Sequence, residues 1–201
     1  MKLKHIYKEG KNEKVLLLLH GTGGTENDLL PLAGMIDPEA SVLSVRGNVS
    51  ENGMPRFFKR LREGVFDEED LIERTRELYE FLDEAAAHYG FRRDQIVAAG
   101  YSNGANIAGS LLFHYEKSLR GALLFHPMVP RRGVDLPDQT GVPVFIGAGE
   151  NDPICPPSET HDLKSLLRAA GAHVTDYWER TGHQLTEQEV RAAGEFYKTQ
   201  F

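Results

Sequence analysis

The chain is poor in cysteine, and its basic residues are fewer than its acidic ones. Its 201 residues include one cysteine, Cys155, which excludes a disulfide within the chain and favours a reducing compartment. Lysines and arginines number 23 against 30 aspartates and glutamates, which gives a formal net charge of −7. Nucleic acids and anionic membranes are bound by basic patches, so this balance argues against both as partners.

Long hydrophobic runs are also missing. The apolar segment VLLLL at 15–19 is far too short to cross a bilayer, and MKLKHIYKEG at the amino terminus has no apolar stretch typical of a secretion signal. We therefore expect a cytoplasmic protein without membrane insertion. A chain of this length buries roughly 70% of its unfolded surface, so we expect one domain over residues 1–201.

What the sequence does contain is short apolar runs that alternate with helical patterns. We expect strands at 3–7, 15–19, 41–45, 96–99, 121–125, 143–147 and 173–178, and helices at about 26–35, 68–89, 103–117, 158–170 and 186–199. Strands and helices that take turns in this way are typical of an α/β fold, with a mostly parallel sheet and helices on both faces.

The stretch AAGYSNGANIAG at 98–109 places Ser102 between two glycines. A strand pattern precedes it and a helix pattern follows, so Ser102 lies at their junction. Gly-x-Ser-x-Gly at such a junction indicates a nucleophile elbow, in which small neighbours let strand, turn and helix crowd together while a strained backbone exposes the hydroxyl. The alternative is that the small residues serve only the close packing of strand and helix.

A serine hydroxyl is a nucleophile at neutral pH only when a base accepts its proton and an acid orients that base. The segment GAGENDPICPP follows an apolar run and contains Asp152, with Glu150 as the alternative acid. The segment ERTGHQLTEQE supplies His183 in the loop before the last helix. The order serine, acid, histidine is that of the α/β-hydrolases, so we predict Ser102, Asp152 and His183 as catalytic residues.

Other histidines fit the role of the base less well. His126, in LLFHPMVP, ends a strand where it can line the site, but it precedes the acid and breaks the expected order. His114 lies on the helix after the serine, about three turns away and too far to act as its base. Four more fall on expected surface positions, where solvated or packing roles are the default: His5, His88, His161 and His173.

Acyl transfer also needs two backbone N–H groups that bind the negatively charged oxygen of the intermediate. We assign one to Asn103, directly after the serine. A glycine-rich loop in LLLLHGTGGTENDLLPLA supplies the second from Thr22, ahead of a helix capped by Thr25 or Asn27. The letters GTGGTE match neither common phosphate-binding glycine pattern, which argues against a nucleotide site.

Together, LLLLHGTGG, GYSNGANIA, GENDPICPP and TGHQL resemble the α/β-hydrolase fold, and within it the phospholipase/carboxylesterase family. This family includes bacterial carboxylesterases of the hydroquinone-resistance type and acyl-protein thioesterases. The resemblance covers nearly the whole chain, and RGNVSENGMPRFFKRLREGVFDEEDL at 46–71 is similar to the bacterial esterase branch. It implies a hydrolase with little or no cap. Asn103 departs from the thioesterase branch, which usually has glutamine there, and this puts assignment to the thioesterases in doubt.

Motifs and resemblance together predict a serine carboxylesterase that hydrolyses short- to medium-chain carboxylic esters through an acyl-enzyme, with a small-molecule ester as substrate. No metal or organic cofactor is expected, because the sequence has no zinc-binding pattern. Two alternatives stay open, namely an acyl thioesterase or lysophospholipase that uses the same residues, and a hydrolase-fold receptor with little turnover. A homodimer is left open as the assembly state.

Apolar residues near the expected site are candidates for a pocket wall, although they fit a core role equally well. They are Met54, Phe57, Phe58 and Phe66 after the third strand, and Ile154 after the acid. From these we take Met54, Phe57, Phe66 and Ile154 as the candidate substrate pocket. Cys155 lies in the acid loop and not at the elbow, so we interpret it as a packed or site-lining thiol.

Overall fold

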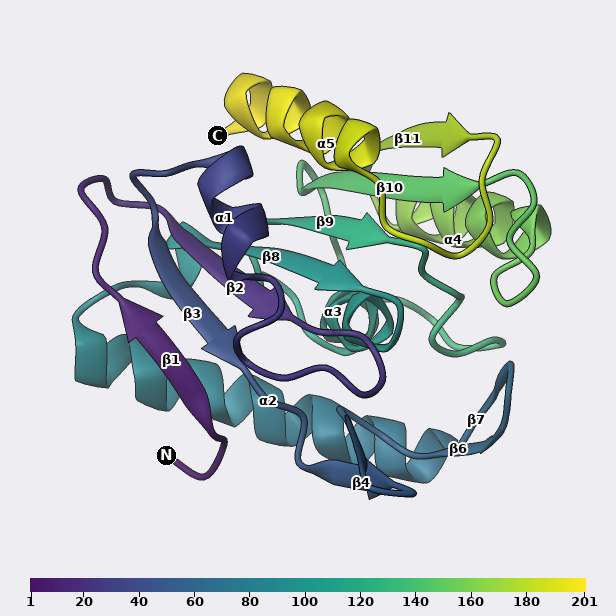
Figure 1. Cartoon of the computed structure of the whole chain (residues 1–201), viewed down its shortest axis with the longest axis horizontal. Coiled ribbons are helices and arrows are strands. Elements are labelled where there is room, and N and C mark those ends of the chain that lie inside the picture. The colour runs from purple at the N-terminus through teal and green to yellow at the C-terminus, as the bar shows by residue number, and fades with distance from the viewer.

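The computed structural model describes residues 1–201 and is built on a sheet of seven strands (Figure 1). The strands are β1 (His5–Lys8), β2 (Val15–Leu19), β3 (Ser41–Val45), β8 (Ile96–Tyr101), β9 (Gly121–Phe125), β10 (Pro143–Gly149) and β11 (His173–Glu179). Their order is β1-β3-β2-β8-β9-β10-β11, in which β1 is antiparallel to β3 and all other neighbours are parallel. The mostly parallel sheet expected from the sequence is confirmed.

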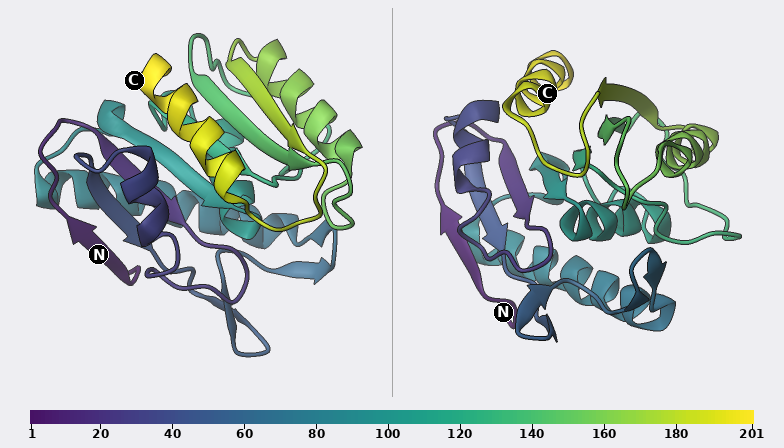
Figure 2. Two further views of the ribbon diagram at one scale, coloured as in Figure 1. Left: turned by 45° about the horizontal axis from the view of Figure 1, so that its top comes forward. Right: turned by 45° about the vertical axis from the view of Figure 1, so that its right-hand side comes forward.

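Helices cover both faces of this sheet. They are α1 (Leu30–Ile36), α2 (Glu68–Tyr89), α3 (Asn103–His114), α4 (Pro157–Ala169) and α5 (Glu187–Gln200), with a 3₁₀ turn at Arg93–Gln95. Helices α1 and α5 pack on one face, and α2, α3 and α4 pack on the other (Figure 1, Figure 2). No helix combines the length and the apolar character that a membrane crossing requires.

The sheet separates two apolar cores because its central strands are apolar on both faces. Along β2, the odd-numbered residues from Val15 to Leu19 join the core under α2, α3 and α4, while Leu16 and Leu18 join the core under α1 and α5. All five side chains are buried. Successive side chains of a strand alternate between faces, so an uninterrupted run such as VLLLL supplies both cores, each buried leucine contributing roughly 1.5–3 kcal/mol.

Local signals set the ends of the long helices. Helix α2 begins after Asp67, whose side chain accepts a hydrogen bond from the Asp70 N–H, and it ends at Gly90, which has a left-handed φ of 79°. Helix α5 begins after Thr186, whose hydroxyl accepts a hydrogen bond from the Glu189 N–H. This cap also fixes the position of Glu189 in the first turn of α5, where its side chain faces the sheet.

Helices α1 and α3 are shorter than predicted. Helix α1 begins only at Leu30, and no side chain caps it. The prediction of a cap from Thr25 or Asn27 was wrong, because the Thr25 hydroxyl accepts a hydrogen bond from the Asn27 N–H and closes an earlier turn. Helix α3 ends at His114, because Tyr115 leaves the helical conformation with φ −135°.

Two hairpins lie between β3 and α2, where we expected no strand. Strand β4 (Val49–Glu51) pairs with β5 (Met54–Arg56), and β6 (Arg60–Arg62) pairs with β7 (Val65–Phe66). The first turn is Asn52-Gly53, with φ values of 51° and 82°. Asn-Gly favours a two-residue hairpin turn, so the sequence does contain a signal for this hairpin.

The parallel strands all end at the same edge of the sheet. Leu19 pairs with Gly100, Tyr101 pairs with Phe125, and Phe125 pairs with Gly147. The loops after β2, β8, β9, β10 and β11 therefore emerge side by side. Ligand sites of open α/β sheets lie beyond this edge.

Candidate active site

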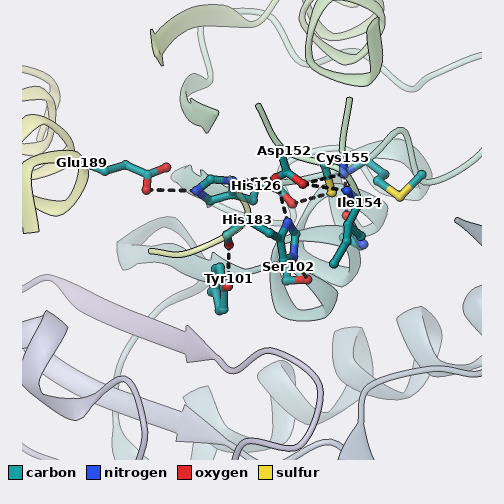
Figure 3. Close-up of polar contacts among 10 residues, drawn as sticks. Tyr101, Ser102, His126, Asp152, Ile154, Cys155, His183 and Glu189 are labelled. Atoms are coloured by element: carbon teal, nitrogen blue, oxygen red, sulfur yellow. Dashed lines mark hydrogen bonds and ion pairs between the residues drawn. The ribbon is translucent and has the colours of Figure 1, made fainter. Parts of the chain in front are cut away.

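Ser102 lies between β8 and α3 in a strained conformation. Its φ of 52° and ψ of −112° fall outside the regions that residues other than glycine ordinarily adopt. A hydrogen bond from its N–H to Phe125 O, 2.9 Å long, holds this backbone against the end of β9. The hydroxyl points toward His183 (Figure 3).

The glycines around Ser102 are required by close backbone contacts. A Cβ on Gly104 would lie 1.9 Å from the carbonyl oxygen of Leu19, and a Cβ on Gly100 would lie 2.5 Å from that of Gly104. Both distances are too short for any real side chain. Close packing of strand and helix and the strained turn at Ser102 are thus parts of the same arrangement.

Ser102, His183 and Asp152 form a hydrogen-bonded chain (Figure 3). Ser102 Oγ lies 2.8 Å from His183 Nε2, and His183 Nδ1 lies 2.7 Å from Asp152 Oδ2. The Asp152 side chain is fully buried, whereas that of His183 is 17% exposed. Glu150, the alternative acid, does not join them, because its half-exposed side chain lies 3.7 Å from Arg180.

Asp152 accepts hydrogen bonds at both carboxylate oxygens. Oδ1 accepts from the N–H groups of Ile154 (2.8 Å) and Cys155 (2.9 Å). Oδ2 accepts from His183 (2.7 Å) and His126 (2.9 Å). Burial raises the pKa of Asp152, but these hydrogen bonds outweigh burial and hold the pKa below its usual range. The carboxylate is therefore ionised at neutral pH.

His126 is a second histidine on the same carboxylate. It directly follows β9, its side chain is 1% exposed, and its Nε2 lies 3.1 Å from Glu189 Oε2 on α5 (Figure 3). A neutral imidazole has one N–H, yet both ring nitrogens of His126 face carboxylate oxygens, an arrangement that favours the protonated imidazole. Burial lowers the pKa of His126, but Glu189 and then Asp152 raise it overall.

Sequence reasoning set His126 aside because of its place in the chain. The order of motifs identifies a base, but it carries no information on which other groups contact the acid. Glu189 lies 63 positions after His126, and only the packing of α5 against the sheet brings the two together. His126, Asp152 and His183 also place ligand atoms within 4.8 Å of one another, as a metal site would. Both histidines instead direct Nδ1 at one oxygen, Asp152 Oδ2, as N–H donors do.

Thr22 and Asn103 both line the pocket that contains Ser102. Asn103 is the first residue of α3, so its N–H has no acceptor within the helix. The Thr22 N–H makes no hydrogen bond to another backbone group. Two free N–H groups beside a serine hydroxyl are what an oxyanion site requires.

The chain at the end of β5 contacts both of these residues. Arg56 Nη1 donates to Thr22 Oγ1 over 2.6 Å. The Phe57 N–H donates to Asn103 Oδ1 over 2.7 Å. The Asn103 side chain thus has a specific partner in this protein, at the position where the thioesterase branch usually has glutamine.

A pocket of about 310 Å³ lies beside Ser102. Its apolar wall includes Met54, Phe66, Met128 and Ile154, so three of the four predicted pocket residues line it. Phe57 does not, and this prediction was wrong. Its side chain is 4% exposed and packs in the core, with its ring 4.7 Å from that of His20. Because side chains alternate along extended chain, the neighbouring Arg56 faces the pocket instead.

Cys155 and Tyr101 line the site in their uncharged forms. The Cys155 thiol donates to His126 O, and burial followed by the charge of Asp152 raises its pKa, so it is no thiolate nucleophile. The Tyr101 hydroxyl donates to His183 O over 2.6 Å. Burial and the charge of Asp152 raise the pKa of Tyr101 to about 12. Tyr101 therefore acts as a donor that holds the histidine loop.

Comparison with known proteins agrees with this fold. The model of the phospholipase/carboxylesterase family matches residues 3–201. The putative hydrolase MhqD of Bacillus subtilis is 61% identical over 196 residues, which cover 98% of each chain. The crystal structure of a Bacillus cereus carboxylesterase is 65% identical with a TM-score of 0.98, over 100% of this chain and 95% of that one. A structure of YahD with malic acid is 32% identical with a TM-score of 0.94, over 99% and 100%.

The chain therefore belongs to the phospholipase/carboxylesterase family and has the α/β-hydrolase fold. Like its esterase relatives, it is an enzyme that hydrolyses ester bonds. The family, the fold and the class of reaction predicted from the sequence are all confirmed.

Proposed function

We propose that the protein is a serine carboxylesterase in which Ser102, His183 and Asp152 hydrolyse small carboxylic esters through an acyl-enzyme. The observation that carries the proposal is the chain of hydrogen bonds of 2.8 and 2.7 Å from Ser102 Oγ through His183 to Asp152. In this geometry His183 Nε2 faces the serine proton, while the Nδ1–H is held by an ionised carboxylate.

In the proposed mechanism, Ser102 Oγ attacks the ester carbonyl carbon as His183 Nε2 accepts the serine proton. The N–H groups of Thr22 and Asn103 bind the oxyanion, and the amino-terminal end of α3 favours the same negative charge. His183 then gives its proton to the leaving alcohol as the carbon–oxygen bond breaks. Water, deprotonated by His183, attacks the acyl carbon. The bond from that carbon to Ser102 Oγ then breaks as His183 returns the proton to Oγ, and the acid leaves. The steps use no metal or organic cofactor.

The size and lining of the pocket support short to medium acyl groups. A volume of about 310 Å³ is at the lower end for small-molecule sites, and the wall includes Met54, Phe66, Met128 and Ile154. Asn103 stands where the thioesterase branch usually has glutamine, and its side chain accepts a hydrogen bond from the Phe57 N–H. We therefore favour esters over thioesters and lysophospholipids.

The test is hydrolysis of p-nitrophenyl esters across acyl lengths by the wild type, by Ser102→Ala and by Ser165→Ala. Ser165 is exposed on α4, so its variant controls for the loss of a serine as such. We expect an optimum at short chains and a fall of at least about 10⁴-fold in kcat for Ser102→Ala alone. Full activity in Ser102→Ala contradicts the proposal. A long-chain optimum favours the lysophospholipase or thioesterase alternative, and a wild type inert to esters and to a fluorophosphonate favours the receptor.

We also propose a cytoplasmic location and one domain over residues 1–201, with a homodimer as the hypothesis for assembly. The lone cysteine, buried at Cys155, agrees with a reducing compartment. Cell fractionation tests the location. Sedimentation equilibrium tests the assembly, with twice the monomer mass expected for a homodimer.

A further inference from the structure

Arg56 is a buried arginine on the wall of the active-site pocket. Its side chain is 4% exposed, and it lines the same cavity as Ser102. Nε donates to Phe58 O over 3.0 Å, and Nη1 donates to Thr22 Oγ1 over 2.6 Å. A guanidinium has five N–H donors. The remaining donors of Arg56, including both on Nη2, have no acceptor in the protein.

The charge of Arg56 is only partly balanced. Glu51 Oε2 lies 3.8 Å from Arg56 Nη1, but both Glu51 oxygens already accept hydrogen bonds of 2.9 Å from Arg60. Two arginines thus share one carboxylate. Glu63, which also lines the cavity, is exposed to solvent. Burial and then the charge of Arg60 lower the pKa of Arg56, yet a guanidinium stays protonated at neutral pH.

A structural role alone does not account for this arrangement. The contacts with Thr22 and with Phe58 O need only neutral donors, whereas a buried and incompletely paired charge is destabilising. A planar guanidinium with free N–H groups is instead the protein group that best binds a carboxylate, through two parallel hydrogen bonds. The contact between Arg56 and Thr22 also places the free donors beside a proposed oxyanion residue, close to the reacting carbonyl.

We propose that this pocket takes esters that carry a carboxylate, and that Arg56 binds this carboxylate close to the scissile ester. Arg56 is then a specificity-determining residue, and the proposal rests on hydrolysis at Ser102. The carboxylate belongs to the acyl half of the ester or to the alcohol half. In either position the chemistry that Arg56 recognises is the same.

The experiment compares charged esters with neutral esters of the same shape, followed by acid release in a pH-stat. For the acyl half the pair is monomethyl succinate and methyl 4-methylpentanoate. For the alcohol half it is O-butyryl glycolate and isobutyl butyrate. In each pair an isopropyl group replaces the carboxylate. We expect the wild type to have the higher kcat/KM on the charged ester in one arm, and that arm identifies the half that Arg56 binds.

Arg56→Gln removes the charge, and Arg62→Gln is the matched control, because Arg62 is exposed on β6 and does not line the cavity. We expect Arg56→Gln to lower the ratio of charged to neutral kcat/KM by about tenfold to a hundredfold, and Arg62→Gln to leave it unchanged.

Equal losses on both esters in Arg56→Gln overturn the proposal, since they show that Arg56 only supports Thr22. A wild-type preference for the neutral ester in both arms also overturns it, with no dependence on how the variant folds. Ser102→Ala, assayed beside these proteins, distinguishes failure of the Arg56 proposal from failure of the proposed function. If it retains activity the proposed function fails, whatever ratio Arg56 sets.

Discussion

Ser102 is positioned by neighbours that carry no chemistry of their own. The strained φ of 52° is held by the bond to Phe125 O, and the turn is possible only because Gly104 meets the Leu19 carbonyl without a side chain. The pattern Gly-x-Ser-x-Gly, together with the strand pattern before it and the helix pattern after it, therefore located the candidate nucleophile. Its two glycines are required because three backbone segments approach one another closely there.

This packing predicts opposite effects for two glycine-to-alanine changes. We expect Gly104→Ala to lower the free energy of unfolding by more than about 3 kcal/mol, because a Cβ 1.9 Å from a carbonyl oxygen displaces backbone. Gly34→Ala, within α1 and with nothing inside 4 Å of the added Cβ, is the control. It should raise stability by roughly 0.5–1 kcal/mol. Urea unfolding measures both, and a mild Gly104→Ala contradicts the packing argument.

The His126–Glu189 pair predicts a pH-dependent stability. The pKa of His126 is raised in the folded protein, so the contribution of the pair is fully present below the unfolded value near 6.5 and is lost as pH rises through the folded pKa. Every tenfold increase in the proton affinity of His126 on folding adds about 1.4 kcal/mol to the free energy of unfolding at low pH. Tyr101 and Cys155, which also lie close to the ring, have raised pKa values and stay neutral through this range. Asp152 and His183 face the ring too, and both are unchanged in the comparison below.

Glu189→Gln tests this, because it removes the carboxylate that raises the pKa of His126. Urea unfolding of the wild type and of Glu189→Gln at several pH values between 6 and 9 gives the difference in their free energies of unfolding. Groups that titrate in the same way in both proteins do not contribute to this difference. We expect the advantage of the wild type over Glu189→Gln to shrink as pH rises. A difference that does not change with pH would show that the pair holds no additional proton.

At the scale of elements, the hairpin β4–β5 and the residue after it contact the loops that contain the proposed oxyanion residues. Besides the contacts of Arg56 and Phe57, the Gly23 N–H donates to Pro55 O over 2.9 Å. The register of these contacts depends on the turn at Asn52-Gly53, where both residues have positive φ. The hairpin lies outside the main sheet (Figure 1).

Replacing Asn52-Gly53 with Ala-Ala therefore separates activity from stability. Alanine disfavours positive φ, so we expect the turn to change and β5 to shift against Thr22 and Asn103. The expected result is a fall of about tenfold in kcat for ester hydrolysis, with a change of under about 1 kcal/mol in the free energy of unfolding. Unchanged kcat contradicts the role given to the hairpin.

The strands differ in how strongly their own sequences predict them. The strands β2, β3, β8, β9 and β10 of the main sheet are largely apolar runs buried on both faces, so the sequence predicts them closely. Strands β4 to β7 have two or three residues each and are partly exposed, so they show no apolar alternation. In the site, the serine, acid and histidine were predictable from ordered motifs. Arg56, His126 and Glu189 were not, because their roles depend on contacts between segments far apart in the chain.

For the molecule as a whole, the two cores meet through one continuous sheet, and the central strands contribute to both. Loss of either core exposes the same strands, so we expect residues 1–201 to unfold in a single cooperative transition. Far-ultraviolet circular dichroism and the fluorescence of Trp178, on β11, should give coincident urea curves. Separate midpoints contradict the proposal of one domain.

The most direct test of the central claim, that Ser102 is the activated nucleophile, is mass spectrometry of the protein after reaction with a fluorophosphonate. We predict one adduct per chain, located on Ser102 by peptide mapping and absent in Ser102→Ala. Labelling should be slower by about 10⁴-fold in Asp152→Asn, which disturbs the histidine tautomer. An adduct on any other residue, or equally fast labelling of Asp152→Asn, would contradict the assignment of Ser102, His183 and Asp152.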